Sequence, residues 1–297
     1  ETPVVEPTGV RQAAALMAQA YAWSESVGTP VIVRVTGALT SGQGPVEEPW
    51  RLPPLGQRFV RKRDRWVVLP ANVVARRRTQ HRRLRQIQEQ FESSPYDTSE
   101  GDGPLGIIAV GVMAAKLQSL LDSSRGATAQ GSEQAGSLWR VLSLSSVYPL
   151  PEEALERRLR GMERVLVLEE GGPFVEERVR DLAQRRGLAL PILGRADRAV
   201  AEEGELNEPQ IVQALQRLDP AFQYAVQTES TRAMPSRVPL CADCPYRPTF
   251  EALVRAMDRH GGRRRHIIVG ETGCMVRANL PPMELFDVKY SLGSGLG

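Results

Sequence analysis

The residues with the most specific chemistry are the three cysteines, which all lie late in the 297-residue chain. Cys241 and Cys244 form a Cys-x-x-Cys pair, and Cys274 ends the glycine-rich run Gly270-Glu-Thr-Gly-Cys. Thiolates in this arrangement ligate iron–sulfur clusters or zinc, or form redox sites. The sequence therefore predicts a metal or redox site built from Cys241, Cys244 and Cys274.

Other interpretations of these cysteines stay open. Each could be a small buried hydrophobe, because free cysteine is among the most buried residue types. A structural zinc site could be completed by His260 or His266, because imidazole and thiolate both suit Zn²⁺. An iron–sulfur cluster needs a fourth thiolate, which would have to lie beyond Gly297.

Two glycine runs are candidates for contact with a cofactor. Gly270 and Gly273 follow an apolar run, where bare backbone can approach a ligand closely. Gly293 and Gly295, near the end of the chain, are candidates for a diphosphate-binding turn, although tight turns explain such glycines equally well. A domain rarely ends inside such a turn, so we expect this chain to be a piece of a longer polypeptide.

Composition places the chain among ordinary globular proteins. Apolar residues make up 41% and charged residues 25%, and the net charge is +3. We find no apolar run long enough for a transmembrane helix, and an odd number of cysteines fits a reduced cytoplasm better than a disulfide scaffold. Arginine clusters between Arg58 and Arg85 and at Arg263–Arg265, but few aromatic residues accompany it, so we expect no nucleic acid partner.

Hydrophobic periodicity predicts an α/β organisation for the elements that would hold these residues. At the start of the chain we expect a helix over 9–27, a buried strand over 31–35 and a loop over 40–58. A charged helix over 76–90 and a linker over 93–103 should follow. The first two elements are typical of part of an α/β sandwich.

Strands and helices then alternate through the middle of the chain. Strands are expected at 105–110, 141–144, 164–168 and 188–192, and helices at 112–121, 151–160 and 174–186, with a loop at 122–136. This alternation predicts a doubly wound parallel sheet. A linker at 228–238, a helix at 249–260 and a strand at 266–269 would open a further α/β domain.

Several short segments together resemble a known family, the alpha subunits of indolepyruvate:ferredoxin oxidoreductases. These enzymes belong to the thiamine-diphosphate-dependent 2-oxoacid:ferredoxin oxidoreductase superfamily. The order and spacing of the segments carry the resemblance, which covers nearly the whole chain. The segments are Gly28–Arg34, Phe59-Val60, Val68–Asn72, Gly106–Gly111, Tyr148–Pro151, Val167–Glu170, Gly204–Asn207, Cys241–Arg247 and Gly270–Cys274.

The resemblance implies a domain plan of thiamine-diphosphate-enzyme type. Residues 1–44 would be the C-terminal part of a pyrimidine-binding α/β domain, and residues 45–103 a connector with the charged helix. Residues 104–225 would form a transketolase-C-like α/β domain. Residues 226–297 would be a linker and the truncated start of a diphosphate-binding domain.

The resemblance also implies an activity. The family oxidatively decarboxylates arylpyruvates on thiamine diphosphate, passes electrons to ferredoxin and the acyl group to coenzyme A, and works with a smaller beta subunit. Gly270, Glu271, Gly273, Cys274, Gly293 and Gly295 would then contact the cofactor, and Cys241, Cys244 and Cys274 would hold a [4Fe–4S] cluster. The Mg²⁺ ligands would lie beyond this chain, so the piece alone should be inactive. We expect a cytoplasmic hetero-oligomer with no membrane contact.

Departures from the family pattern favour a second interpretation of the function. The family's CPGCPHRG segment is Cys241-Ala-Asp-Cys-Pro-Tyr-Arg-Pro248 here, and Glu271 replaces an aspartate. An arginine and a histidine of the family are missing after Thr36. The alternative is therefore a non-catalytic scaffold or regulatory paralogue that keeps the fold with degenerate thiamine motifs.

Overall fold

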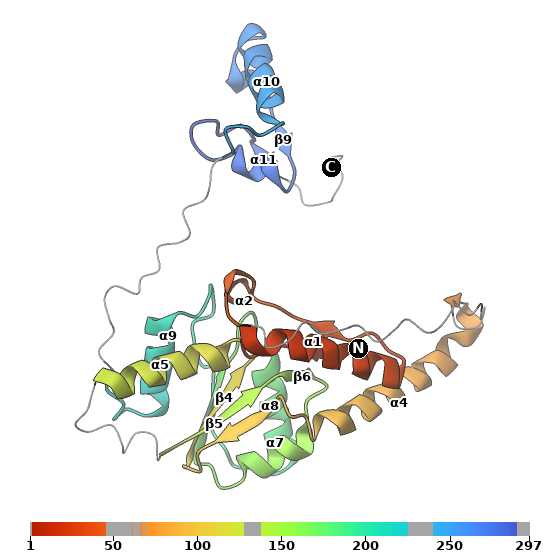
Figure 1. Cartoon of the computed structure of the whole chain (residues 1–297), viewed down its shortest axis with the longest axis vertical. Helices are drawn as coiled ribbons and strands as arrows, with labels where there is room; N and C mark the ends of the chain where they lie inside the picture. Colours follow the sequence, from red (N-terminus) through yellow and green to blue (C-terminus); the bar gives the residue numbers. More distant parts are fainter. Residues whose placement is uncertain are drawn as a thin grey trace. The chain divides into compact units, whose positions relative to one another are not determined.

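A computed structural model of the chain describes residues 2–45, 61, 66–67, 69–127, 138–224 and 240–289. The chain divides into two compact units, Glu1–Val226 and Gln227–Gly297 (Figure 1). The predicted linker at 228–238 and the terminal glycines Gly293 and Gly295 lie outside the described residues. No helix of the described part is long and apolar enough to cross a lipid bilayer.

The first unit is organised around a five-stranded sheet with the order β3-β5-β4-β7-β8. Four of its strands run parallel: β4 (Leu105–Val110), β5 (Trp139–Leu144), β7 (Arg164–Leu168) and β8 (Ile192–Leu193). The short edge strand β3 (Thr98–Glu100) pairs antiparallel with β5. The predicted α/β fold with a parallel sheet is therefore confirmed.

Helices cover both faces of this sheet, and the alternation of side chains along β4 shows why. Ile107 and Ala109 pack into a core with α5 (Met113–Ala127) and α9 (Glu208–Leu218). Ile108 and Val110 point the other way, into a core with α7 (Glu152–Leu159) and α8 (Phe174–Arg185). Side chains alternate across a strand with a period of two, so an unbroken apolar strand supplies both faces of a doubly wound sheet.

The N-terminal segment packs against this unit through a small second sheet. Strand β1 (Val4–Val5) pairs parallel with β2 (Ile32–Val33) and antiparallel with β6 (Ser146–Tyr148), which follows directly after β5. Helix α1 (Val10–Val27) ends at Gly28, which has φ 72°. Glycine adopts this left-handed conformation without strain, which is why it ends the helix. The short helix α2 (Gly37–Ser41) follows β2.

Helix α4 (Val73–Phe91) follows the 3₁₀ turn η1 (Pro70–Asn72) and packs on α1 with its C-terminal end. Ile87 and Phe91 are its two buried residues, and they join a core with Leu16, Trp23 and Val27 of α1. The rings of Trp23 and Phe91 meet edge to face with centroids 4.9 Å apart, a favoured aromatic geometry.

The second unit is small. It contains α10 (Arg247–Arg259), the 3₁₀ turn η3 (Arg263–Arg265), α11 (Cys274–Arg277) and the two parallel strands β9 (Val269–Gly270) and β10 (Val288–Lys289). Its core consists of Leu240, Cys244, Phe250, Met257, Ile268, Ala278 and Leu285.

Several sequence predictions were wrong in detail. The run Val31–Val35 forms a strand of only two residues, β2, at a sheet edge; Ile32 of this strand is 50% exposed, and so is Val35 beyond its end. The predicted linker at 93–103 contains β3, and the predicted loop at 122–136 begins inside α5. Strand β6 and helix α9 were missed.

Candidate functional site

The parallel sheet has a topological switch point between β4 and β7. The chain moves from β4 outward to β5, then returns past β4 to β7. In open α/β sheets, ligands bind outside the carboxyl ends of the strands at such a point. Gly111 follows β4 there, and Glu169 and Glu170 follow β7. This edge is the first place to look for a site.

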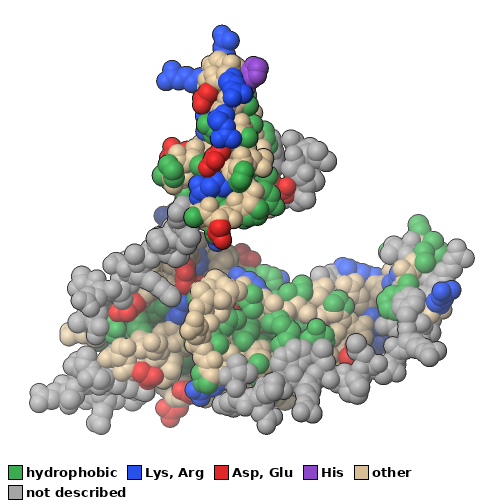
Figure 2. Space-filling view, turned by 45° about the horizontal axis from the view of Figure 1, so that its top comes forward, with side chains coloured by type: hydrophobic (Ala, Val, Ile, Leu, Met, Phe, Trp, Pro, Cys, Tyr) green, Lys and Arg blue, Asp and Glu red, His purple; other side chains and the backbone are tan. Residues whose placement is uncertain are grey.

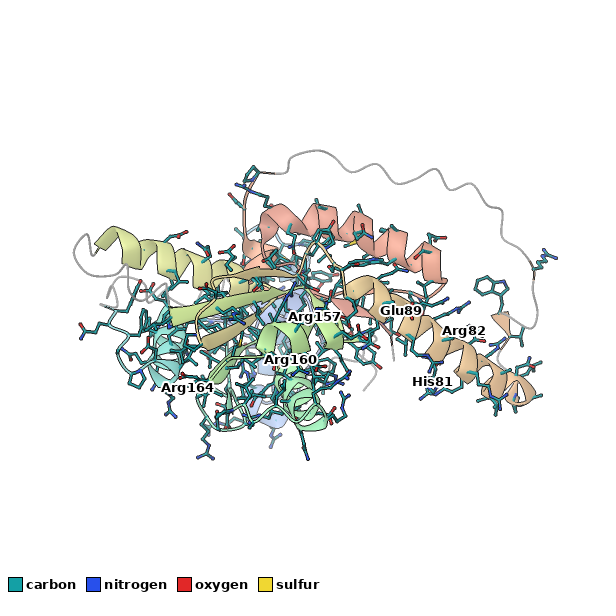
Figure 3. The ribbon with its side chains drawn as sticks, turned by 90° about the horizontal axis from the view of Figure 1, so that it is seen from below. His81, Arg82, Glu89, Arg157, Arg160 and Arg164 are labelled. Carbon is teal, nitrogen blue, oxygen red and sulfur yellow. The ribbon has the colours of Figure 1, made fainter. Side chains whose placement is uncertain are left out.

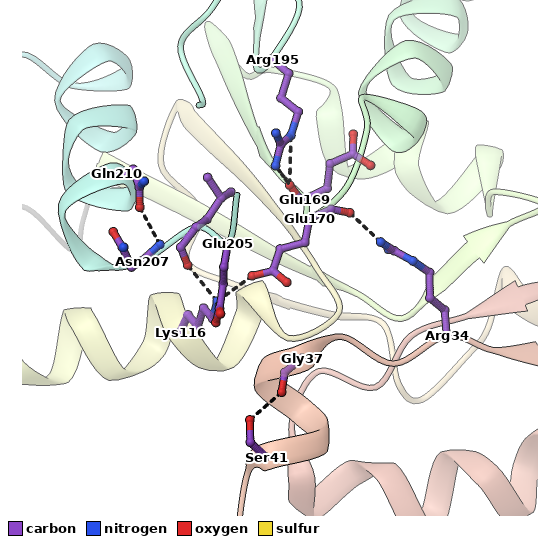
Figure 4. Close-up of polar contacts among 11 residues, drawn as sticks. Arg34, Gly37, Ser41, Lys116, Glu169, Glu170, Arg195, Glu205, Asn207 and Gln210 are labelled. Atoms are coloured by element: carbon purple, nitrogen blue, oxygen red, sulfur yellow. Dashed lines mark hydrogen bonds and ion pairs between the residues drawn. The ribbon is translucent and has the colours of Figure 1, made fainter. Parts of the chain in front are cut away.

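Glu170 at this edge forms an ion-pair network with Lys116 of α5 (Figure 4). The Lys116 ammonium donates to Glu170 Oε1 at 2.6 Å, to Glu205 Oε1 at 2.8 Å and to the Leu206 carbonyl at 2.8 Å. An ammonium group has three protons to donate, so these three acceptors satisfy it fully. The network joins α5, the end of β7 and the segment before α9.

The N-terminal segment reaches the same edge through Arg34. Its guanidinium pairs with the Glu6 carboxylate and donates from Nη2 to the Glu170 carbonyl at 2.8 Å. Burial raises the pKa of Glu6, while the hydrogen bond and charge of Arg34 act in the opposite direction. A Cβ on Gly111 would lie 2.4 Å from Glu6 Oε2, so only glycine lets Glu6 approach this closely.

Glu169, the other residue of the acidic pair, serves as an N-terminal cap. Its two carboxylate oxygens accept the backbone N–H groups of Val175 and Glu176, each at 2.9 Å, in the first turn of α8. Its backbone carbonyl accepts from Arg195 Nη2 at 3.0 Å. Burial is the largest influence on the Glu169 carboxyl and raises its pKa. The pair therefore has a structural use, and its side chains are already occupied.

The switch point is thus filled by the chain's own side chains. Glu6 and Arg34 from the N-terminal segment and Lys116 from α5 converge on the strand ends where a ligand would otherwise bind. Such an arrangement orients segments and holds them together. In the sequence, Glu169 and Glu170 were noted only as the end of the segment Val167–Glu170, and Lys116 was not noted as a site residue. The rarity of lysine in this arginine-rich chain was the one available signal.

A surface pocket of about 440 Å³ lies elsewhere in the first unit, beside the start of α1 and the first turns of α5. Thr8, Gln12, Glu100, Gln118 and Ser143 contribute polar groups to its lining. The Gln12 side-chain oxygen accepts from the Ser145 hydroxyl at 3.0 Å and from the Thr8 N–H at 2.8 Å. None of the residues predicted as site residues lines this pocket.

The three cysteines lie in the second unit in different environments. Cys241 is exposed, Cys244 is buried and Cys274 is half-buried as the first residue of α11. Cys244 belongs to the unit's core, and Cys274 packs against the same core. Arg277 Nη1 of α11 lies 3.8 Å from the Cys241 sulfur, so α11 contacts the Cys-x-x-Cys segment at its first cysteine.

The thiols as arranged do not make a complete metal site. Among the described residues, there is no group of three or more His, Cys, Asp or Glu side chains that could hold a metal ion. His266, the predicted rival ligand, has a buried Nε2 without a hydrogen-bond partner. The cysteine ligand set remains a prediction.

The glycine-rich turn shows two different reasons for glycine. A Cβ on Gly270 would lie 2.7 Å from the Phe286 ring, so this glycine permits close packing inside the unit. Gly273 has φ 85° and open space around its Cβ position, which leaves its backbone accessible. Glu271 lies between them, half-buried, with its N–H directed at the Met275 sulfur at 3.2 Å. Of the predicted contacts, Gly273 best suits an approaching ligand.

The fold and the site define a doubly wound α/β protein with a second, small α/β unit. Comparison with known proteins shows which proteins this chain is similar to. The chain is 29% identical over 312 residues to the indolepyruvate oxidoreductase subunit IorA of Pyrococcus abyssi, covering 99% of this chain and 45% of that protein. It is also 29% identical over 302 residues to the subunit IorA of Methanothermobacter thermautotrophicus, covering 99% and 47%. The resemblance predicted from the sequence is confirmed.

The chain spans about half the length of the curated relatives it matches. No family model matches it. Among solved structures, it is similar to a 2-oxoglutarate:ferredoxin oxidoreductase from Magnetococcus marinus, with 14% identity, a TM-score of 0.47, and coverage of 73% of this chain and 42% of that one. It is also similar to a split-gene transketolase, with 18% identity, a TM-score of 0.38, and coverage of 65% and 47%.

Proposed function

We propose that this chain is part of an oxidoreductase that oxidatively decarboxylates arylpyruvates of the indolepyruvate type. Aryl-acetyl-CoA would be the product, and ferredoxin the electron acceptor. One observation carries the proposal: the chain matches IorA subunits at 27–29% identity over 99% of its length. Similarity that runs through both units supports a shared architecture better than a match confined to one of them would.

Thiamine diphosphate with Mg²⁺ is the cofactor that we propose for this enzyme. When bound, it supplies the carbon chemistry of decarboxylation, while the protein positions it and excludes water. Gly273 supports the proposal because its open backbone would let a ligand come close. Glu271 and Cys274 flank it, Gly270 lies at the base of the turn, and Gly293 and Gly295 lie outside the described residues. The Mg²⁺ ligands would belong to the part of the relatives that this chain does not span.

The proposed assembly contains a smaller beta subunit, with coenzyme A and the arylpyruvate as substrates, in the cytoplasm. The word "subunit" in the names of the relatives supports a hetero-oligomer. Cys241, Cys244 and Cys274 would contribute to a [4Fe–4S] cluster only with a further thiolate. Because half of the relatives' length is missing here, we propose that this chain alone is inactive.

Residues 1–44 and 226–297 would, on this proposal, represent parts of the two thiamine-binding domains, and 104–225 the transketolase-C-like domain. That middle domain would be architectural. Its switch point is filled by Lys116, Arg34 and Glu6, which supports a role in holding segments together rather than in binding substrate.

A non-catalytic scaffold is the second candidate, favoured by the second unit. Tyr246 stands where the family has histidine, and its ring is 52% exposed and stacks on Phe250 with centroids 6.1 Å apart. A tyrosine offers no imidazole nitrogen at this position. The described cysteines also form no metal-holding group.

The full-length protein, purified anaerobically with its partner subunit, distinguishes the two candidates. Thiamine diphosphate and iron content should be measured together with indolepyruvate-dependent dye reduction. The enzyme proposal predicts bound thiamine and turnover. A folded protein that contains neither thiamine diphosphate nor iron would contradict the enzyme proposal and support the non-catalytic scaffold.

A further inference from the structure

Helix α4 has a charge pattern that its own stability does not explain. From Val73 to Gln88 it contains the arginines 76, 77, 78, 82, 83 and 85 and no Asp or Glu, and its first acidic residue is Glu89. Its first turn carries no acidic residue and no side-chain cap. Cations near a helix N-terminus interact unfavourably with the helix dipole. Like charges at i,i+4, such as Arg78 and Arg82, also repel each other.

The outer half of α4 is not held by the core. Its two buried residues, Ile87 and Phe91, both lie in the C-terminal third of the helix. Helix α1 ends near Arg83, because a Cβ on Gly28 would lie 3.3 Å from Arg83 Nη2. The turns before Arg83 therefore extend beyond α1, as Figure 1 shows, and Arg82 lies on this extension in Figure 3.

The extension ends in exposed apolar side chains. Val73 is 51% exposed, Val74 62% and Leu69 44%, with Trp66 at 52% nearby in the sequence. Figure 2 shows basic and hydrophobic side chains together at this outer end. We call the set Trp66, Leu69, Val73, Val74, Arg78 and Arg82 the α4 tip. Arg78 and Arg82 are exposed, and neither has an ion pair or hydrogen bond within the described residues.

The composition of the α4 tip is that of a protein-binding surface. Arginine and tryptophan are enriched among the residues that dominate protein interfaces, whereas lysine is depleted there. Helix α4 contains no lysine, and Trp66 is the one aromatic side chain in the α4 tip as the structure describes it, whereas a single-strand-binding surface stacks successive bases on several aromatic rings. Exposed valines beside arginines match a partner with an apolar patch inside an acidic rim.

We propose that the α4 tip docks an acidic protein partner. Resting on the proposed function, this partner is the acidic electron acceptor, ferredoxin. Carboxylates of the partner would pair with Arg78 and Arg82 and relieve the repulsion between them. The departures from helix-stabilising charge placement are then the cost of a docking surface, since local rules are commonly broken at functional positions.

The test uses the full-length protein with its partner subunit and a double charge reversal, Arg78→Glu with Arg82→Glu. Both positions are exposed and precede Ile87 and Phe91, the buried residues of α4, so folding should be preserved. The matched control, Arg11→Glu with Arg217→Glu, makes the same net charge change at exposed positions on α1 and α9. Ferredoxin binding by calorimetry and the rates of ferredoxin and methyl viologen reduction are measured at low and high salt.

Docking at the α4 tip predicts that the double reversal weakens ferredoxin binding and raises KM for ferredoxin by about tenfold or more at low salt. Viologen reduction and the control variant should be unchanged. Equal ferredoxin affinity in wild type and the double reversal overturns the proposal. The proposal is also overturned if the double reversal loses binding to a mixed-sequence single-stranded DNA but keeps its ferredoxin binding. That result would assign the surface to nucleic acid. Tip-dependent ferredoxin binding without any viologen turnover would sustain docking and reject the proposed activity.

Discussion

The ammonium nitrogen of Lys116 lies 2.6 Å from Glu170 Oε1, joining the first helix of the central sheet to the end of β7. This contact lies at the position where a doubly wound sheet usually receives its ligand. Arg34 holds the backbone of the same glutamate from the opposite side, at 2.8 Å from its carbonyl. Glu170 thereby links the N-terminal segment to the central sheet, in addition to the pairing of β1 with β6.

Removing Lys116 should destabilise the first unit. In Lys116→Met, the Glu170 carboxylate, 10% exposed, loses its partner, and the Leu206 carbonyl loses a donor. We expect a loss of about 1–3 kcal/mol in the free energy of unfolding, because a partly buried charge is left uncompensated. Urea unfolding measures it, with Arg217→Met as a control that removes an exposed cation. Equal effects of the two substitutions would contradict the structural role of Lys116.

Asp97 should make the stability depend on pH. Its Oδ1 accepts the backbone N–H groups of Ser145 at 2.6 Å and Ser146 at 3.0 Å, but burial dominates and raises its pKa above the usual 3.8. The folded state therefore binds the proton more tightly than the unfolded state. This contribution to stability is lost as pH rises from about 4 through the raised folded pKa.

The Asp97→Asn variant tests this dependence, because its amide has no proton to lose. Relative to wild type, the variant should gain stability as pH rises from 3.5 to 7. Glu6 and Glu169, whose pKa values burial also raises, are present in both proteins and cancel. Urea unfolding across this range provides the difference, and Asp102→Asn, which removes an exposed carboxylate, is the control. If the stability of the wild type relative to Asp97→Asn increased with pH, the predicted direction of the pH dependence would be wrong.

The central sheet was predictable because its strands are apolar on both faces. Leu105–Val110 and Arg164–Leu168 form strands with the predicted bounds, because every residue of the two runs except Arg164 is apolar and buried. Helix α1 and its end at Gly28 were also predictable, from periodicity and a left-handed glycine. Strand β3, with the sequence Thr-Ser-Glu, was not, because it is wholly exposed and is held by its pairing with β5 rather than by burial.

The candidate site was less predictable than the fold. Glu169 and Glu170 are neighbours of the same type in the sequence, yet Glu169 caps α8 and Glu170 binds Lys116, which lies 54 residues away in sequence. Such partners depend on the path of the chain between strands, which local patterns do not encode. The cysteine spacing likewise could not show that Cys244 would be packed in the core while Cys241 is exposed.

Gly270 should be required for packing in the second unit. In Gly270→Ala the new methyl group would meet the Phe286 ring, at 2.7 Å before any adjustment, and we expect a loss of about 1–3 kcal/mol. Phe286→Leu removes the obstructing ring edge, so the same alanine should cost less in that background. Thermal unfolding of the wild type, the two single variants and the double variant measures the coupling free energy between Gly270 and Phe286. Additive costs would indicate that Gly270 is required for another reason.

The three cysteines should differ in their effect on stability. Cys244→Ala removes a 7% exposed side chain from the core, whereas Cys241→Ala removes an exposed one. We expect the first substitution to cost about 1 kcal/mol more than the second in metal-free protein, because only it leaves a cavity. Chemical unfolding after chelation measures the difference. Indistinguishable costs would contradict the packing described for Cys244.

The most direct test of the proposed function is indolepyruvate-dependent, coenzyme A-dependent reduction of ferredoxin by the full-length protein and its partner subunit under anaerobic conditions. The proposal predicts turnover that requires thiamine diphosphate and is faster with indolepyruvate than with 2-oxoglutarate. A folded, thiamine-loaded assembly that reduces ferredoxin with 2-oxoglutarate alone would contradict the arylpyruvate assignment. A folded assembly that binds no thiamine and shows no turnover would contradict the enzyme itself.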